Sequence, residues 1–189
     1  MLDTLFDTAS GRVALVAFAV LFVATLVISF VNPKNKIRKD LKCDYVATDS
    51  TFLYKIEDVT KMLGQYKPEH YEAHESFILV YDLVYPLCYA IPSVLILAYF
   101  FPALFPGSRG WTRLLVLLPL AAMFFDYAEN FTMLAFLRNY RENPATPLKL
   151  LELSRLFTVA KLSLLLVSML ILFGFGARGL ARLRDSVLK

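Results

Sequence analysis

The sequence predicts an all-α membrane protein: a four-transmembrane-helix bundle with a short helical extramembrane loop between the first and second spans. The first observation is composition, because 58% of the 189 residues are hydrophobic and the mean hydropathy is +0.56, which is too apolar for an ordinary soluble domain. The second is length, because four apolar runs each approach the roughly 20 residues that a helix needs to span hydrocarbon. We expect one membrane domain over residues 1–189, with spans at about 13–31, 77–101, 114–136 and 153–175.

The first apolar run is expected to be a retained span rather than a signal peptide. Its length of about nineteen residues exceeds the ~7–15 residues of a signal-peptide core. The sequence Asn32-Pro33-Lys34 that follows does not offer the small residues of a cleavage site. Four spans would put both termini on one side of the membrane. Basic residues are divided almost evenly between the two sides, so the orientation and the identity of the membrane stay open.

Residues 32–76 form the one sizeable extramembrane loop in this prediction. Ile56, Val59 and Met62 recur at helical spacing, and Pro68 can occupy the first turn of a second helix that runs into the second span. We therefore expect two short amphipathic helices lying on the membrane surface. A basic cluster precedes them, formed by Lys34, Lys36, Arg38, Lys39 and Lys42.

Ionisable residues inside three of the apolar runs are the strongest functional signal in the chain. Counted from the end nearest the long loop, Asp82 lies about one and a half turns into the second span and Lys161 about two turns into the fourth. On that same side, Glu129 and Asp126 lie about two and three turns into the third span. All four fall in the same half of the predicted bundle. Each charge costs on the order of 2.5–3.5 kcal/mol to insert, so we expect these residues to face the interior and find partners there.

Polar residues recur three and four positions apart in the second, third and fourth spans, so each of these helices carries one polar stripe. Pro86, one turn after Asp82, lacks a backbone donor, and we expect it to kink the second span and free a carbonyl beside the acids. The candidate cluster on these stripes comprises Asp82, Tyr85, Tyr89, Asp126, Glu129, Asn130, Arg155, Thr158 and Lys161.

Two interpretations of this cluster stay open. In the structural interpretation, Lys161 and Arg155 pair with the acids and hold the helices together. In the functional interpretation, the same residues form a proton relay, an ion path or a catalytic acid–base pair, because opposed charges in low dielectric carry pKa values suited to proton transfer. Three acids face two bases. An uncompensated acid would be protonated or bind a cation, which favours the functional interpretation.

His70 and His74 form a second candidate site just outside the second span. They stand at i and i+4 on one helical face, as metal-ligating pairs do, and Glu69 or Glu75 could add oxygen ligands. The glutamates do not match the HExxH pattern, which places Glu directly after the first histidine. A polar interfacial face is the competing interpretation.

Other motifs are missing from the sequence. It contains no glycine-rich phosphate loop, nucleophile elbow or CxxC pair, so no cofactor is predicted. The net charge is +4, but the basic residues lie mostly in loops and at expected helix ends, where they would contact lipid headgroups. Membrane lipids rather than nucleic acid are therefore the expected partners. Cys43 and Cys88 lie in different predicted environments and make a poor disulfide pair.

Short motifs in three of the predicted spans carry a resemblance to known proteins. They are Asp82-Leu83-Val84-Tyr85-Pro86, Asp126-Tyr127-Ala128-Glu129-Asn130 and Lys161. With these motifs and the loop that precedes them, the chain resembles a group of bacterial four-span integral membrane proteins whose activity is not known. The resemblance covers most of the chain and implies no reaction. The basic insert 33–42 departs from that group, which indicates a special headgroup or partner contact.

Three functional hypotheses follow from the sequence. The first is a non-catalytic integral membrane protein, either free-standing or an accessory subunit of a larger complex with other membrane subunits as partners. The second is an intramembrane enzyme or lipid-binding protein that uses the ionisable residues of the spans. The third is a proton or cation carrier built on the same residues.

Overall fold

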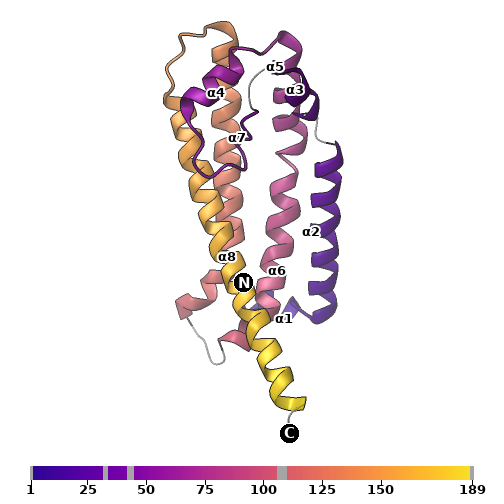
Figure 1. Cartoon of the computed structure of the whole chain (residues 1–189). Coiled ribbons are helices and arrows are strands. Elements are labelled where there is room, and N and C mark those ends of the chain that lie inside the picture. Colours follow the sequence, from indigo (N-terminus) through magenta and orange to yellow (C-terminus); the bar gives the residue numbers. More distant parts are fainter. Residues whose placement is uncertain (1, 32–33, 42–44, 106–109, 188–189) are drawn as a thin grey trace.

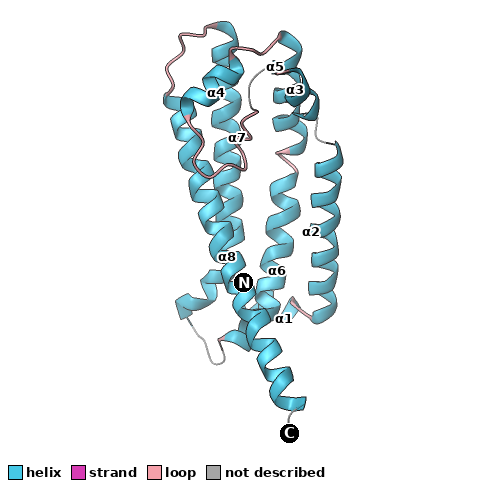
Figure 2. Cartoon of the chain, viewed as in Figure 1, coloured by secondary structure: helices cyan, strands magenta, loops and turns pink. Residues whose placement is uncertain are grey.

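The computed structural model describes residues 2–31, 34–41, 45–105 and 110–187, and every element in these ranges is a helix (Figure 1, Figure 2). The all-α prediction is confirmed. In chain order the elements are α1 (Leu2–Thr8), α2 (Gly11–Val31), α3 (Lys34–Asp40), α4 (Ile56–Leu63), α5 (Pro68–Ser76), the π-helix η1 (Phe77–Tyr81), α6 (Tyr85–Leu104), the 3₁₀-helix η2 (Gly110–Leu117), α7 (Leu118–Glu142) and α8 (Lys149–Val187).

Three helical segments in the described ranges are long and apolar enough to cross a membrane. They are Pro68–Pro102, Thr112–Glu142 and Lys149–Gly174. The first predicted span lies in α2, whose apolar part, Gly11–Val27, is shorter. By length and composition the structure therefore supports a membrane protein with three candidate spans, and the four-span arrangement stays a prediction.

The long helices run side by side, with α2 at the edge of the bundle (Figure 1). The most extensive packing joins α7 to α8, while α6 contacts both of these helices and also packs against α2. Large apolar side chains such as Leu15, Phe124, Leu156 and Phe173 are exposed on the outside. This much exposed apolar surface is what a lipid-facing bundle presents.

The helix that holds the second predicted span is broken, although not in the expected way. α5 continues through η1 and a turn at residues 82–84 into α6. Pro86 lies in the first turn of α6, where a missing N–H group costs no helical hydrogen bond. The expected kink at Pro86 is therefore wrong in its position. The break precedes the proline, and it is the π-helix and the turn that interrupt the ladder of backbone hydrogen bonds.

The long loop contains the two expected helices, α4 and α5. The buried residues Val59, Met62 and Leu63 of α4 belong to a hydrophobic cluster that also includes Leu137 of α7 and Leu151 of α8. α4 therefore covers one end of the bundle with its apolar face.

Residues 45–55, which we call the inserted segment, lie against the helices of the bundle. Between α3 and α4 they run down along the bundle before the chain rises again to α4 (Figure 1). Thr48 is only 3% exposed. The backbone of this segment therefore contacts α8, a packing that the expected pair of surface helices does not include.

At the opposite end of the bundle, α1 packs across α6. The ring of Phe6 lies 5.8 Å from that of Phe101, and the guanidinium of Arg113 lies 4.7 Å above the Phe6 ring. Arg113 also forms an ion pair with Asp3. Polar groups thus reappear at this end, outside an apolar cluster formed by Leu97, Phe101 and Val116.

Candidate functional site

Lys161 of α8 is at the centre of the buried polar cluster. Its side chain is almost fully buried, and Nζ lies 3.1 Å from Oδ1 of Asp126 and 2.5 Å from Oε2 of Glu129. The same nitrogen donates to the backbone carbonyl of Asp49 at 2.8 Å. An ammonium group has three N–H donors, and three oxygen atoms from this chain surround it. The predicted contact of Lys161 with the acids of α7 is therefore present.

Asp126 links three helices through its two oxygen atoms. Oδ1 faces Lys161 of α8, while Oδ2 accepts a hydrogen bond of 2.9 Å from the hydroxyl of Tyr89 on α6. Tyr85 packs edge-on against Tyr89, with ring centroids 5.4 Å apart. Both oxygens of the Asp126 carboxylate are thus occupied by side chains of neighbouring helices, and the tyrosine pair is held beside the acids.

Glu129 carries the excess of negative charge in the cluster. Its side chain is 2% exposed, and its closest cation is Lys161. Two carboxylates, Asp126 and Glu129, thus share one ammonium group. Buried ions of one sign in excess are costly, so this imbalance is the feature of the cluster that most needs a physical explanation.

The break before α6 supplies backbone acceptors to side chains of α7. The amide nitrogen of Asn130 donates to the carbonyl of Asp82 at 2.9 Å, and the hydroxyl of Tyr127 donates to the carbonyl of Leu83 at 3.0 Å. A freed carbonyl beside the acids was expected from the sequence, and these bonds show two of them. Tyr127 was missed as a member of the site, although it lies inside the Asp126–Asn130 motif.

Asp82 was expected to pair with the bases of the cluster, and it is not among the ion-pair partners of Lys161. Its charge is among those that raise the pKa of the Tyr45 phenol in the inserted segment. Burial raises the pKa of Tyr45 most, and the neighbouring Tyr66, Asp49 and Asp82 raise it further. Asp82 reaches the Lys161 cluster through its backbone carbonyl and Asn130. The two carboxylates that ion-pair with Lys161 both come from α7.

The inserted segment completes the cluster with backbone groups. The hydroxyl of Thr158 donates to the carbonyl of Ser154 at 3.1 Å and lies 3.4 Å from the carbonyl of Thr48, next to the Lys161–Asp49 bond. Sequence reasoning missed these contacts because backbone carbonyls leave no trace in residue identity. The available signal was the polar run Thr48–Thr51, which predicts a turn, and backbone bonds from Ser50 and Thr51 to Ala47 form that turn.

Arg155 does not join the Lys161 ion pairs. Its side chain is partly exposed, and its charge acts on Tyr54 of the inserted segment, whose hydroxyl lies 3.5 Å from the carbonyl of Leu151. Burial raises the pKa of Tyr54 to about 12, while Ser154, Thr158 and Arg155 lower it. The expected second base of the cluster therefore lies at its edge.

His70 and His74 are both buried, and each has a neighbour other than a metal ion. Nε2 of His70 lies 3.4 Å from a carboxylate oxygen of Asp40, and its Nδ1 accepts from the backbone of Lys67. Nδ1 of His74 lies 3.2 Å from the hydroxyl of Tyr66. Among the described residues, no three His, Cys, Asp or Glu side chains gather as metal ligands. The two histidines instead tie α5 to α3 and to the chain after α4.

The polar neighbours of the cluster lie toward the long-loop side of the bundle. On the side of the long loop the cluster adjoins the polar groups of the inserted segment, whereas the opposite half contains the apolar residues Leu97, Phe101 and Val116. The arrangement can hold charge and protons inside the bundle.

Comparison of the chain with protein-family models, curated proteins and solved structures finds no match. The resemblance to bacterial four-span proteins therefore stays a prediction, and the functional argument depends on the geometry alone.

Proposed function

We propose that this chain is a non-catalytic integral membrane protein with four spans, of which α2 is the first. In this proposal the buried cluster is a structural lock that holds the inserted segment against α7 and α8. The observation that carries the proposal is the commitment of Lys161, which donates to Asp126 and to the carbonyl of Asp49 and forms an ion pair with Glu129. A lysine that acts as a nucleophile or base needs a free amine, and this one is committed to partners within the chain.

The outer surface of the chain supports a role as an accessory subunit of a larger membrane complex. Its long helices expose large apolar side chains, and the long loop is mostly folded back onto the end of the bundle. Within the cluster, Lys161, Asp126 and Tyr89 are bound to one another. Lipids and other membrane subunits are the partners that such a surface can bind.

Cysteine accessibility tests the four-span arrangement. In a chain whose own cysteines are replaced by serine, we would introduce Thr4→Cys, Ala145→Cys or Ser186→Cys and label sealed membranes with an impermeant maleimide. Four spans place positions 4 and 186 on one side and position 145, between α7 and α8, on the other. Labelling of positions 4 and 186 from opposite sides would contradict the proposal and leave three spans.

Purification from native membranes in mild detergent tests the accessory role. We expect companion proteins at fixed stoichiometry, and the same companions with the double variant Lys161→Met/Glu129→Gln, which removes the cation and one of its two acids, if that variant folds. Arg155→Met is the matched control on α8. A folded double variant that loses these companions, while Arg155→Met keeps them, would show that the charges do more than lock the structure.

Proton binding inside the bundle is the second candidate function. The specific observation is the pair of buried carboxylates that share one ammonium group, because a proton or a cation would neutralise the excess charge. Protons would enter from the loop side, since the other half of the bundle is apolar.

Vesicles with an internal pH dye separate this candidate from the lock. After a pH jump, a carrier would show proton flux that Glu129→Gln abolishes and that Arg155→Met leaves unchanged. The lock predicts no flux above that of empty vesicles for any of these proteins.

A further inference from the structure

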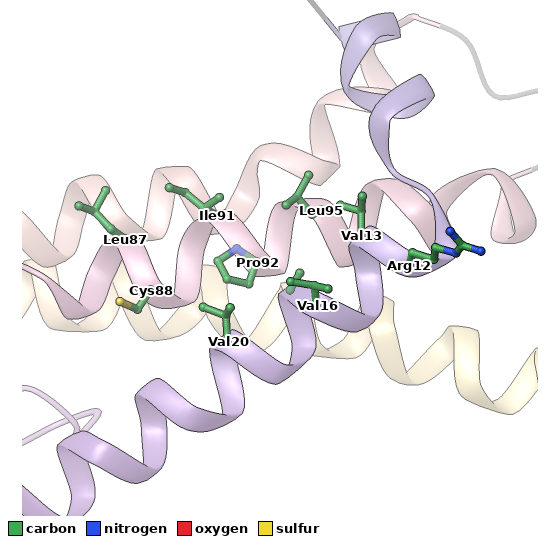
Figure 3. A pocket seen from close by; sticks show the side chains of 10 residues that line it. Arg12, Val13, Val16, Val20, Leu87, Cys88, Ile91, Pro92 and Leu95 are labelled. Atoms are coloured by element: carbon green, nitrogen blue, oxygen red, sulfur yellow. The ribbon is translucent and has the colours of Figure 1, made fainter.

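An apolar groove of about 550 Å³ lies between α2 and α6, away from the Lys161 cluster (Figure 3). α2 contributes one wall, including Val13, Val16 and Val20, and α6 contributes the other, including Leu87 and Ile91. The two helices run antiparallel, so the Arg12 end of the first wall faces the Leu95 end of the second. Eight residues from Arg12 to Val20 correspond to about 12 Å of helix.

The shape and lining of this groove suit a hydrocarbon chain better than another helix. Helices that associate in membranes meet through small residues and interhelical hydrogen bonds. The groove is lined almost entirely by branched aliphatic side chains and Pro92, and its one alanine, Ala17, is already buried. A flexible acyl chain can follow such a narrow apolar surface without leaving polar groups unpaired.

Polar groups mark the mouth of the groove. Arg12 is exposed at one end of the groove-lining residues of α2 (Figure 3). It has no ion pair with another described residue, whereas Arg113 pairs with Asp3. The hydroxyl of Tyr99 lies beside the start of α2, where a Cβ on Gly11 would approach it to 3.1 Å. A guanidinium and a tyrosine at the end of an apolar surface are typical of the headgroup layer.

From this placement we infer that the α2–α6 groove is a binding site for one acyl chain of a glycerophospholipid whose phosphate is held by Arg12. The site goes beyond the proposed accessory role and requires only that α2 lies in the membrane. Charge complementarity selects the headgroup, and the aliphatic walls accommodate the tail. The preferred ligand is an anionic lipid, because net negative charge adds to the attraction of Arg12.

The inference is tested by delipidating the purified chain, adding equal amounts of phosphatidylglycerol and phosphatidylcholine, and counting retained lipids by native mass spectrometry. We expect one tightly held lipid per chain, with phosphatidylglycerol favoured about fivefold over phosphatidylcholine, the effect of about one surface charge. Arg12→Gln should remove that preference.

Two sets of substitutions on α2 separate the groove from the rest of its surface. Val16→Phe/Val20→Phe fills the groove and should reduce lipid retention about tenfold, which corresponds to about 1.4 kcal/mol of binding free energy. Leu15→Phe/Leu26→Phe places the same rings on the other exposed face and should change nothing.

Cys88 provides a second readout, because it lines the groove and is free. In a Cys43→Ser background, added phosphatidylglycerol should slow alkylation of Cys88 by a small membrane-permeant maleimide, and the groove-filling variant should lose this lipid effect.

Three results at the groove itself would overturn the inference. They are equal lipid retention by the groove-filling and control variants, alkylation of Cys88 that ignores lipid, and a companion protein that the groove-filling variant releases. The last would identify the groove as a helix-docking surface and would leave the accessory role intact, whereas absence of α2 from the membrane in the labelling experiment would end both proposals.

Discussion

Replacing Lys161 by methionine is expected to destabilise the bundle strongly, because methionine keeps the apolar stem of the side chain and removes its charge. The substitution leaves Asp126 and Glu129 without their cation and the carbonyl of Asp49 without its donor. Polar contacts between membrane helices contribute ~0.6 kcal/mol on average and at most ~1.7 kcal/mol each, so three contacts amount to about 2–5 kcal/mol. The cost of breaking a buried ion pair, about 3–5 kcal/mol, overlaps with this range.

Thermal unfolding in a defined detergent measures the loss. A change of this size corresponds to a fall in Tm of about 6–15 °C for a chain of this length. Lys161→Met/Glu129→Gln should regain a large part of the loss, because it removes one stranded carboxylate together with the cation. Arg155→Met on the same helix should stay within about 0.5 kcal/mol of the parent protein.

Limited trypsin digestion supplies a local readout of the same perturbation. Lys55 is exposed at the end of the inserted segment, and release of that segment from α8 should make this position easier to cut. If Lys161→Met were as stable as Arg155→Met, and if Lys55 were cleaved no faster, the cluster would not be the lock that we describe.

Three further outcomes follow from individual contacts. Asn130→Leu should cost about 1–3 kcal/mol in thermal unfolding, because it leaves the buried carbonyl of Asp82 without its donor. Thr132→Val should cost much less, because the hydroxyl of Thr132 bonds only to its own helix. Equal losses would contradict the role of Asn130 in pairing this carbonyl. Tyr89→Phe should cost about 0.5–1.5 kcal/mol of unfolding free energy, because the hydroxyl of Tyr89 donates to Asp126. Its cost should not add to that of Lys161→Met, because both side chains contact Asp126. Strict additivity of the two losses would show that the contacts are not coupled. The pKa of Tyr54, raised to about 12, predicts that its contribution to stability is complete below the ordinary tyrosine pKa of 10.0 and is lost as the pH rises toward 12. Tyr54→Phe should therefore reduce the loss of stability at alkaline pH, measured by unfolding at a series of pH values.

The candidate cluster illustrates how far sequence reasoning reaches in such a protein. Helical rise placed Lys161 at the depth of Asp126 and Glu129, and the structure brings the three side chains together. This worked because an α-helix converts residue number into depth, and because buried charges must find partners. The same reasoning placed Arg155 in the cluster, although a side chain near a helix end can reach the edge of the bundle.

The break in the second span shows where local rules fall short. Pro86 correctly indicated an irregular backbone, but the irregularity lies at residues 77–84 and the proline merely begins α6. Which turn of a helix is interrupted depends on the side chains that satisfy the freed carbonyls. Here these side chains are Asn130 and Tyr127 of another helix.

By itself, the sequence determined the all-helical class, the positions of the long apolar helices, the two short helices of the loop and the shared depth of the buried charges. Each of these depends on residue type and periodicity along one helix, which are local properties. Only the tertiary structure decided that the inserted segment enters the bundle, that Asp49 completes the shell of Lys161, and that α2 and α6 leave an apolar groove. These features depend on backbone carbonyls and on the fit of two surfaces, and neither is encoded in the pattern of any single segment.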